Sequence, residues 1–199
     1  MKKFLFCILS LPILISFSSC GSNEIQFETK SYVSENGNIA IEYPIIKENT
    51  ENKFNEYISG YVSEICSDLA GDEPDSFDID IGYSVCFVDD VISVLFEGVL
   101  NYNASAHPVN VVYSVNYSIV DGKNIPFVEQ LDGKTKEDIA KCALGNDIIS
   151  ELYSEADILR YIEEAGKFGS QVCYYRTSDG TYITLPVPHA VGDYVKIKI

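Results

Sequence analysis

The sequence is short of basic residues. Lysine and arginine together number 14, against 30 aspartates and glutamates, which gives a formal net charge of −16. Because nucleic acids are polyanions, an acidic surface repels them, and nucleic-acid binding is disfavoured. The composition also excludes disordered, collagen-like and coiled-coil proteins, since 46% of the 199 residues are hydrophobic and 12% are aromatic. This length and composition favour a single globular domain.

Motifs for catalysis and metal binding are also absent. The sequence has no Gly-x-Ser-x-Gly elbow, no His-Glu-x-x-His helix, no phosphate-binding loop and no dinucleotide fingerprint. Its two histidines, His107 and His189, stand in proline-containing loops without the spacing of metal ligands. They share a site only if the two loops meet. The Asp89-Asp90 pair is typical of a solvated strand turn. We therefore expect a protein that is not an enzyme and has no metal or cofactor.

Residues 1–19 have the features of a bacterial lipoprotein signal peptide. Lys2 and Lys3 precede an uncharged apolar stretch, residues 4–17, that is too short to span a bilayer. Ser18-Ser19-Cys20 then matches a lipobox, which predicts cleavage before Cys20 and lipidation of its thiol; ordinary secretion is the alternative. Cleavage removes two lysines and no acidic residue, so the mature chain has a formal charge of −18. We expect a lipid-anchored cell-envelope protein that faces outside the cytoplasm, with residues 20–24 as its lipidated tether.

Four further cysteines remain in the mature chain: Cys66, Cys86, Cys142 and Cys173. In an oxidising compartment they allow three disulfide connectivities. Free buried thiols that pack as small hydrophobic groups are the other interpretation. A helix over residues 51–70 would place Cys66 and Cys86 on opposite sides of a sheet, which favours pairing of either one with Cys142 or Cys173.

The N-terminal subregion, residues 25–75, is predicted to form a β-hairpin followed by a helix. Asn36-Gly37 is a hairpin-turn dipeptide between two short strands, and Pro44 should end the second strand. Residues 51–70 then follow a helical period. The apolar stripe of this helix consists of Phe54, Ile58, Val62, Ile65 and Leu69.

The C-terminal subregion, residues 76–199, begins with strict alternation of apolar and polar residues over 77–121. This pattern predicts three long antiparallel strands with one buried face. Two helices are expected within 128–166, the second broken near Ser154, and three short strands follow within 170–198. The order is ββα-βββ-αα-βββ. We predict one α+β domain over residues 25–199, a twisted antiparallel sheet with the helices packed on one face.

Several short segments occur in an order that resembles a known envelope domain. Tyr43-Pro44 precedes the first helix, Ala106-His107-Pro108 lies between strands, and Leu185-Pro186-Val187-Pro188-His189-Ala190-Val191-Gly192-Asp193-Tyr194 stands near the end. This order is similar to the extracellular domain shared by RsiV-type anti-sigma factors and the N-terminal part of PdaC-type peptidoglycan deacetylases. The resemblance covers nearly all of the mature chain and implies an α+β envelope domain; RsiV-type members bind lysozyme. Since the sequence has no cytoplasmic anti-sigma segment, no transmembrane helix and no His-x-x-x-His motif, only the extracellular module is implied.

We therefore expect a non-enzymatic extracellular binding module for lysozyme or another cationic muramidase. Peptidoglycan or glycan binding is an alternative, and an envelope hydrolase is a less favoured one. The resemblance implies partner contacts from Pro188, His189 and Tyr194, with His189 where the family has a tyrosine. Ser105 and His107 are the candidates from the other loop, unless both loops only close strands. Replacing Pro188 and His189 together by Ala should weaken binding by at least ~1 kcal/mol and leave the Tm nearly unchanged.

Overall fold

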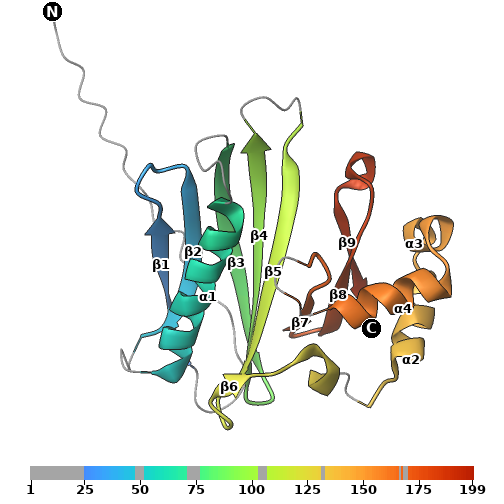
Figure 1. Ribbon diagram of the computed structural model, residues 1–199. Coiled ribbons are helices and arrows are strands. Elements are labelled where there is room, and N and C mark those ends of the chain that lie inside the picture. Colours follow the sequence, from blue (N-terminus) through green and yellow to red (C-terminus); the bar gives the residue numbers. More distant parts are fainter. Residues whose placement is uncertain are drawn as a thin grey trace, which may run out of the picture.

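The computed structural model describes residues 25–47, 52–70, 77–102, 107–130, 133–165, 167 and 170–199. Within these residues the chain forms two β-sheets and four α-helices (Figure 1). The larger sheet contains β1 Phe27–Val33, β2 Ile39–Ile46, β3 Phe77–Val88, β4 Val91–Tyr102, β5 Val109–Ser118 and β6 Lys123–Asn124, in that order. The smaller sheet contains β7 Tyr174–Thr177, β8 Gly180–Pro186 and β9 Tyr194–Lys198. The helices are α1 Lys53–Ala70, α2 Lys136–Leu144, α3 Asp147–Leu152 and α4 Glu155–Glu164, with 3₁₀ turns η2 Phe127–Gln130 and η3 His189–Val191.

The α+β class is confirmed, but the arrangement differs from the single antiparallel sheet that the sequence predicts. The strands divide into two sheets, and β2 pairs with β3 in parallel, with Ile39 beside Ile79. Parallel neighbours need a crossover connection, and α1 provides it between β2 and β3. The helices also divide: α1 covers the larger sheet, whereas α2, α3 and α4 lie beside the smaller one (Figure 1).

The predicted stripe of α1 faces the first core. Phe54, Ile58 and Ile65 are fully buried, Val62 is nearly so, and Leu69 is partly buried. They pack against strand residues of one face of the larger sheet, among them Ile41, Ile81, Val94 and Phe96. Burial of a side chain of this size contributes about 1.5–3 kcal/mol. The helix is therefore held mainly by packing on the sheet.

The smaller sheet packs on the opposite face of the larger one, beside β4 and β5. Leu95 and Val112 meet Cys173 and Tyr175 in a small apolar cluster there. Two polar bridges fix the contact, because the Arg176 N–H donates to Ser93 Oγ at 2.7 Å and Asn116 Nδ2 donates to the Tyr174 carbonyl at 2.6 Å. The second core lies between the smaller sheet and its helices. Its fully buried members include Ile139, Ile149, Ile158, Ile183 and Leu185.

The helix break predicted near Ser154 is confirmed. α3 ends at Leu152, and Ser154 is the N-cap of α4. Its Oγ accepts the Asp157 N–H, and the Asp157 carboxylate accepts the Ser154 N–H, which completes a capping box. The capping box supplies acceptors for backbone N–H groups at the start of α4 that would otherwise have no partner within the helix.

Pro44 does not end β2, contrary to the prediction. It lies within the strand, opposite Thr29 of β1. The pairing of β2 with β3 extends only from Ile39 to Ile41, so no neighbouring strand needs an N–H at position 44 on that side. Proline is tolerated at such an edge position because its missing donor breaks no ladder bond.

The four cysteines are free in the structure. Cys66 is buried in the first core, while Cys86 is half-buried on β3, on the other face of the larger sheet, as predicted. Cys142 is exposed, and its thiol donates to the Lys198 carbonyl at 3.1 Å. Cys173 lies between the two sheets, and burial raises the pKa of its thiol to about 12. Of the two interpretations that the sequence leaves open, the structure has the free thiols, and the buried Cys173 packs as a small hydrophobic residue.

The larger sheet has two distinct ends. At the turn end, Asp89 and Asp90 join β3 to β4 with φ of 51° and 62°, the positive values that a two-residue hairpin turn requires. Lys47 N–H donates to the Gln26 carbonyl at 3.0 Å, so the described chain also begins at the turn end. At the loop end, β4 finishes and β5 starts. The 12 residues of β4, at about 3.4 Å each, separate the two ends by about 40 Å.

Candidate partner-binding site

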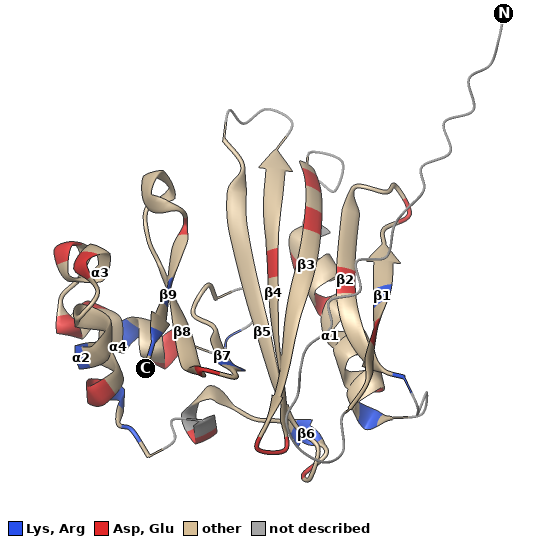
Figure 2. Ribbon diagram, turned by 180° about the vertical axis from the view of Figure 1, so that it is seen from behind, with Lys and Arg blue, Asp and Glu red and all other residues tan. Residues whose placement is uncertain are grey.

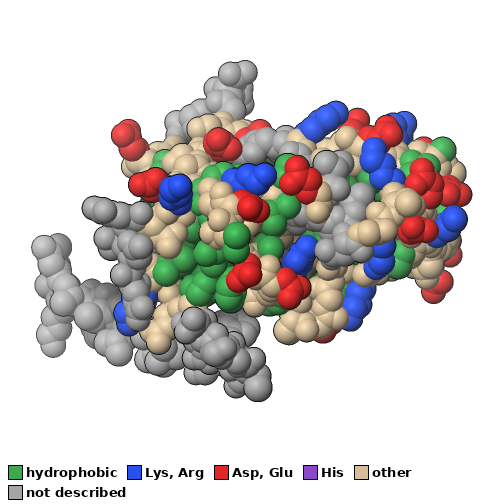
Figure 3. Space-filling model, turned by 90° about the horizontal axis from the view of Figure 1, so that it is seen from below, with side chains coloured by type: hydrophobic (Ala, Val, Ile, Leu, Met, Phe, Trp, Pro, Cys, Tyr) green, Lys and Arg blue, Asp and Glu red, His purple; other side chains and the backbone are tan. Residues whose placement is uncertain are grey.

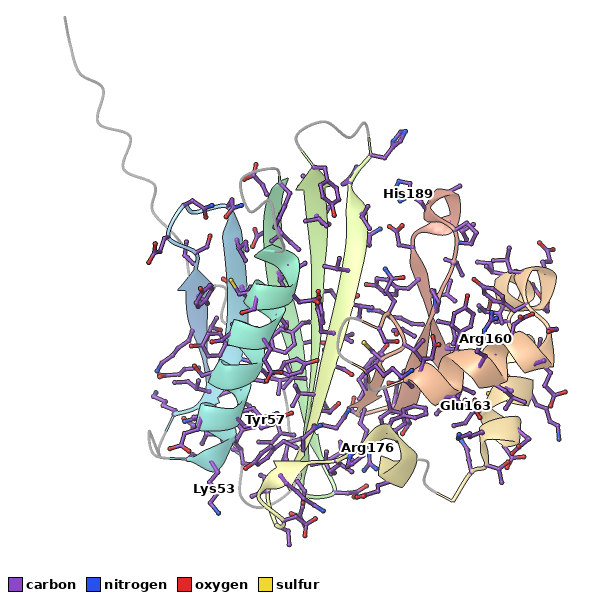
Figure 4. The ribbon with its side chains drawn as sticks, viewed as in Figure 1. Lys53, Tyr57, Arg160, Glu163, Arg176 and His189 are labelled. Carbon is purple, nitrogen blue, oxygen red and sulfur yellow. The ribbon has the colours of Figure 1, made fainter. Side chains whose placement is uncertain are left out.

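The two loops that carry the predicted contact residues meet at the loop end. His107 precedes β5, and His189 lies in η3 between β8 and β9. Their rings have centroids 5.8 Å apart and are tilted by 48°. Residues 82 positions apart in the sequence are thereby brought into one exposed surface. Figure 4 labels His189 at this end of the molecule and Lys53 at the other.

The loop between β8 and β9 is a closed, internally bonded turn. The Val187 N–H donates to the Asp193 carbonyl at 2.8 Å, and the Val191 N–H donates to the Pro188 carbonyl at 2.8 Å. Gly192, with φ of 119°, ends η3 in a backbone region that L side chains rarely adopt. These bonds and the fixed φ of Pro188 give the loop a defined shape before any partner binds.

Asp193 ties the two loops together. Its side chain is only 7% exposed, and its Oδ1 lies 2.8 Å from His189 Nδ1. Its Oδ2 accepts the backbone N–H of Asn110 at 2.8 Å and the side-chain amide of Asn110 at 3.0 Å. Burial alone would raise the pKa of Asp193, but the hydrogen bonds from Asn110 and His189 outweigh it and hold the pKa below its usual range.

Sequence reasoning missed both Asp193 and Asn110. Asp193 follows a glycine, and a Gly-Asp pair is typical of an ordinary turn. Asn110 has the pattern of a solvent-facing polar residue in a strand. Local signals of this kind do not reveal a contact over 83 positions. The backbone at Asp193 has a φ of 70°, which directs the carboxylate back toward Asn110 and His189. The sequence pattern does not predict a positive φ at this position.

Tyr194 lies apart from the histidine pair, in the contact between the two sheets. It is half-buried beside the cluster of Leu95 and Tyr175, and its hydroxyl donates to Glu97 Oε1 at 2.6 Å. Lys196 pairs with the same carboxylate at 2.7 Å. Burial first, and then the hydrogen bond to Glu97 and the Glu97 charge, raise the pKa of Tyr194 well above its usual range. The structure therefore gives Tyr194 a role in holding the smaller sheet on β4.

Two of the predicted site residues, Cys20 and Ser105, lie outside the described residues. The predicted site that the structure brings together thus consists of His107, Pro188 and His189, with Asn110 and Asp193 beneath them. We call these five residues the loop-end surface.

An acidic area lies beside the loop-end surface on the larger sheet. Asp78 and Asp80 are exposed near the start of β3. They lie opposite Asn101 and Val99, in the half of β4 that is nearer the loop end. β3 is two strands from β5, so this area begins about 10 Å from the start of β5. In Figure 2 the ribbon of this part of β3 has the red colour of Asp and Glu. The loop end therefore combines histidine and proline with nearby negative charge.

A cavity of about 410 Å³ lies elsewhere, between α1, β5 and the segment before β7. Tyr57 and Tyr61 line it from α1, with their rings stacked at 6.4 Å, and Asn124 and Lys167 add exposed polar groups. Volumes of this size suit a small ligand. An aromatic wall with amide and ammonium groups is suited to a polar ring such as a sugar.

Within the described parts of the chain, no group of three or more His, Cys, Asp or Glu side chains is arranged to hold a metal ion. No helix in those parts is long and apolar enough to cross a membrane.

The chain is similar in fold to a solved DUF3298 family protein from Pseudomonas aeruginosa PAO1. The TM-score is 0.54 and the identity 12%, over 89% of this chain and 91% of that one. A member of the same family from Bacteroides fragilis NCTC 9343 has a TM-score of 0.44 and 16% identity, over 87% and 88% of the two chains. No protein-family model and no curated protein matches the sequence. The Pseudomonas structure supports the fold over most of the chain.

Proposed function

We propose that this protein is a lipid-anchored, non-enzymatic binding module of the cell envelope, and that its partner is a basic protein of the lysozyme or muramidase class. The observation that carries the proposal is the loop-end surface, where two loops are locked together by Asp193. Function in rigid β-sheet proteins is often carried by loops held on a scaffold. The sequence resemblance to the extracellular domain of RsiV-type proteins supplies the class of partner.

The position of the surface suits a receptor-like role. The described chain begins at the turn end, five residues after Cys20. The loop-end surface lies about 40 Å away, at the other end of β4. With Cys20 in a membrane, this surface points toward proteins that arrive from outside the cell.

The charge of the molecule suits a basic partner. A mature charge of −18, with Asp78 and Asp80 close to the loop end, attracts a cation over distances near the Debye length of ~8 Å at physiological salt. Such charges act mainly on the rate of association. The loop contacts then determine how long the complex lasts.

The test is a pull-down of the lipoprotein with lysozyme, followed by association kinetics at ~0.02 M and ~0.15 M salt. The double variant Asp78→Asn/Asp80→Asn should associate more slowly at low salt. The matched control Glu28→Gln/Glu56→Gln removes the same charge from the turn end, where Glu28 lies opposite Ile45 and Glu56 is in the first turn of α1, and it should associate nearly as the wild type does. If lysozyme is not retained at either salt concentration, this partner is removed from the proposal.

A second candidate function, peptidoglycan or glycan binding, is favoured by the cavity lined by Tyr57 and Tyr61. Its test is co-sedimentation of the protein with purified peptidoglycan, compared with the variant Tyr57→Ala. Tyr57 is half-buried, so the melting temperature of the variant is measured as well. Loss of sedimentation with an unchanged fold would favour the glycan over the protein partner.

A further inference from the structure

The turn end carries an exposed apolar tip. Val120 is 75% exposed, Ile119 is 38% exposed and Phe87 is 36% exposed. Their segments are joined, because the Ile119 N–H donates to the Asp90 carbonyl at 2.9 Å. Figure 3 views the molecule from this end and shows apolar side chains gathered in one area, with basic and acidic side chains around it.

The same end is where the described chain begins. Phe27 pairs with Ile46 at the start of β1, and β2 runs parallel to β3, so position 27 and the Asp89-Asp90 turn lie at one end of the sheet. Between Cys20 and Ile25 the chain spans at most about 18 Å when fully extended. A lipid on Cys20 therefore keeps the turn end within a short distance of the bilayer surface.

We infer that the turn end docks on the membrane that holds the anchor, with Ile119 and Val120 inserted among the lipids and Phe87 beside them. We call Phe87, Ile119 and Val120 the membrane-side tip. The inference rests on the lipid anchor of the proposed function and is independent of the partner. Its occupant is a lipid surface, because the tether delivers that surface to this end of the protein.

The tip is built for apolar contact more than for attraction to anionic lipid. Two lysines flank the tip. Lys53 Nζ would lie 3.8 Å from a Cβ atom built on Gly122, two residues after Val120, and Lys123 follows Gly122 in the chain. Asp89, Asp90 and Asp121 in the same two turns offset these positive charges. With a mature charge of −18 the free domain has little attraction to an anionic bilayer.

The tether makes such a weak contact effective. Three apolar side chains alone give only marginal membrane affinity, as a single acyl chain does. A short linker converts the contact into an intramolecular event with an effective concentration in the millimolar range. Docking would fix the orientation of the domain and hold the loop-end surface away from the lipids.

The experiment uses the lipidated protein in vesicles of phosphatidylethanolamine and phosphatidylglycerol, with hydrogen–deuterium exchange as the readout. The variant Ile119→Ser/Val120→Ser is compared with the wild type, and Val191→Ser is the matched control, since Val191 is 44% exposed in η3 at the loop end. Exchange in residues 87–91, which carry no substitution, should be at least ~3-fold faster in the double variant than in the wild type. The control should leave it unchanged.

Three results would overturn the inference. One is equal exchange of residues 87–91 in the wild type and the double variant. Another is an increase in exchange that depends on protein density in the vesicle, which would mean that a second copy covers the tip. The last is a mass spectrum without lipid on Cys20. Lysozyme retention is measured on the same vesicles: its loss with the exchange pattern intact would refute the partner and leave the docking in place.

Discussion

Asp193 is the residue on which the geometry of the loop end depends most. It is a buried carboxylate with three hydrogen-bond donors, two from Asn110 and one from His189. Hydrogen bonds to a charged group each make a net contribution of about 1.5–3 kcal/mol to stability. The carboxylate is therefore stable as an anion only while both loops stay in contact.

The stability of the protein should depend on pH through Asp193. Since the pKa of this carboxyl is lower in the folded than in the unfolded chain, its stabilising effect is full above about pH 4 and is lost as the pH falls through the folded value. Denaturant unfolding of the wild type and of Asp193→Asn should show a difference at pH 7 that shrinks toward pH 3. A difference that stays constant over this range would show that the Asp193 charge does not stabilise the fold.

The two histidines should differ in their effect on stability. His189→Ala removes a partner of a buried carboxylate and should cost about 1 kcal/mol or more of unfolding free energy. His107→Ala changes an exposed side chain and should cost less than ~0.5 kcal/mol. Thermal melts check both values. Equal costs would mean that His189 and Asp193 are not coupled.

Because His189 bonds the buried Asp193, we now expect the double replacement of Pro188 and His189 by Ala to lower the Tm. The sequence alone led to the expectation of an unchanged Tm.

At the scale of elements, the close approach of β3 and β4 requires a glycine at position 98. A Cβ there would lie 2.6 Å from Ile81 Cγ1 and 2.7 Å from the Asp80 carbonyl. Gly82, on the neighbouring strand, has nothing within 4 Å of the same added atom.

The substitution Gly98→Ala should therefore destabilise the fold by about 1–3 kcal/mol, the usual cost of overpacking, because the carbonyl it meets belongs to the backbone. Gly82→Ala is the matched control and should change stability by less than ~1 kcal/mol. Urea unfolding of the two variants makes the comparison. A Gly98→Ala protein as stable as Gly82→Ala would contradict the register of β3 and β4.

The elements also show where sequence reasoning reaches its limit. The α1 stripe, the long alternating strands and the break at Ser154 are all encoded locally, by periodicity and by capping residues, and were predictable. The division into two sheets was not, because it depends on contacts such as Asn116 with Tyr174, 58 positions apart. The sequence predicts that His107 and His189 share a site only if their loops meet. The bond from Asn110 to Asp193, which brings the loops together, has no sequence signature.

At the scale of the whole molecule, the proposed lipid anchor and the proposed partner use opposite ends of the larger sheet. The described chain begins at the turn end, where the membrane-side tip also lies, and the loop-end surface lies about 40 Å away. An acidic protein of this kind should capture a basic partner faster at low salt, with the loops setting the lifetime of the complex.

The most direct test of this account is the affinity of the anchored protein for lysozyme, measured for the wild type and for His107→Ala/Pro188→Ala. Both side chains are exposed, so the fold should be kept. The control Ile148→Ser alters an exposed residue of α3. We predict that the double variant binds at least ~5-fold more weakly, about 1 kcal/mol, with an unchanged Tm and with the control equal to the wild type. Equal affinities of the three proteins, or no binding by the wild type, would contradict the account.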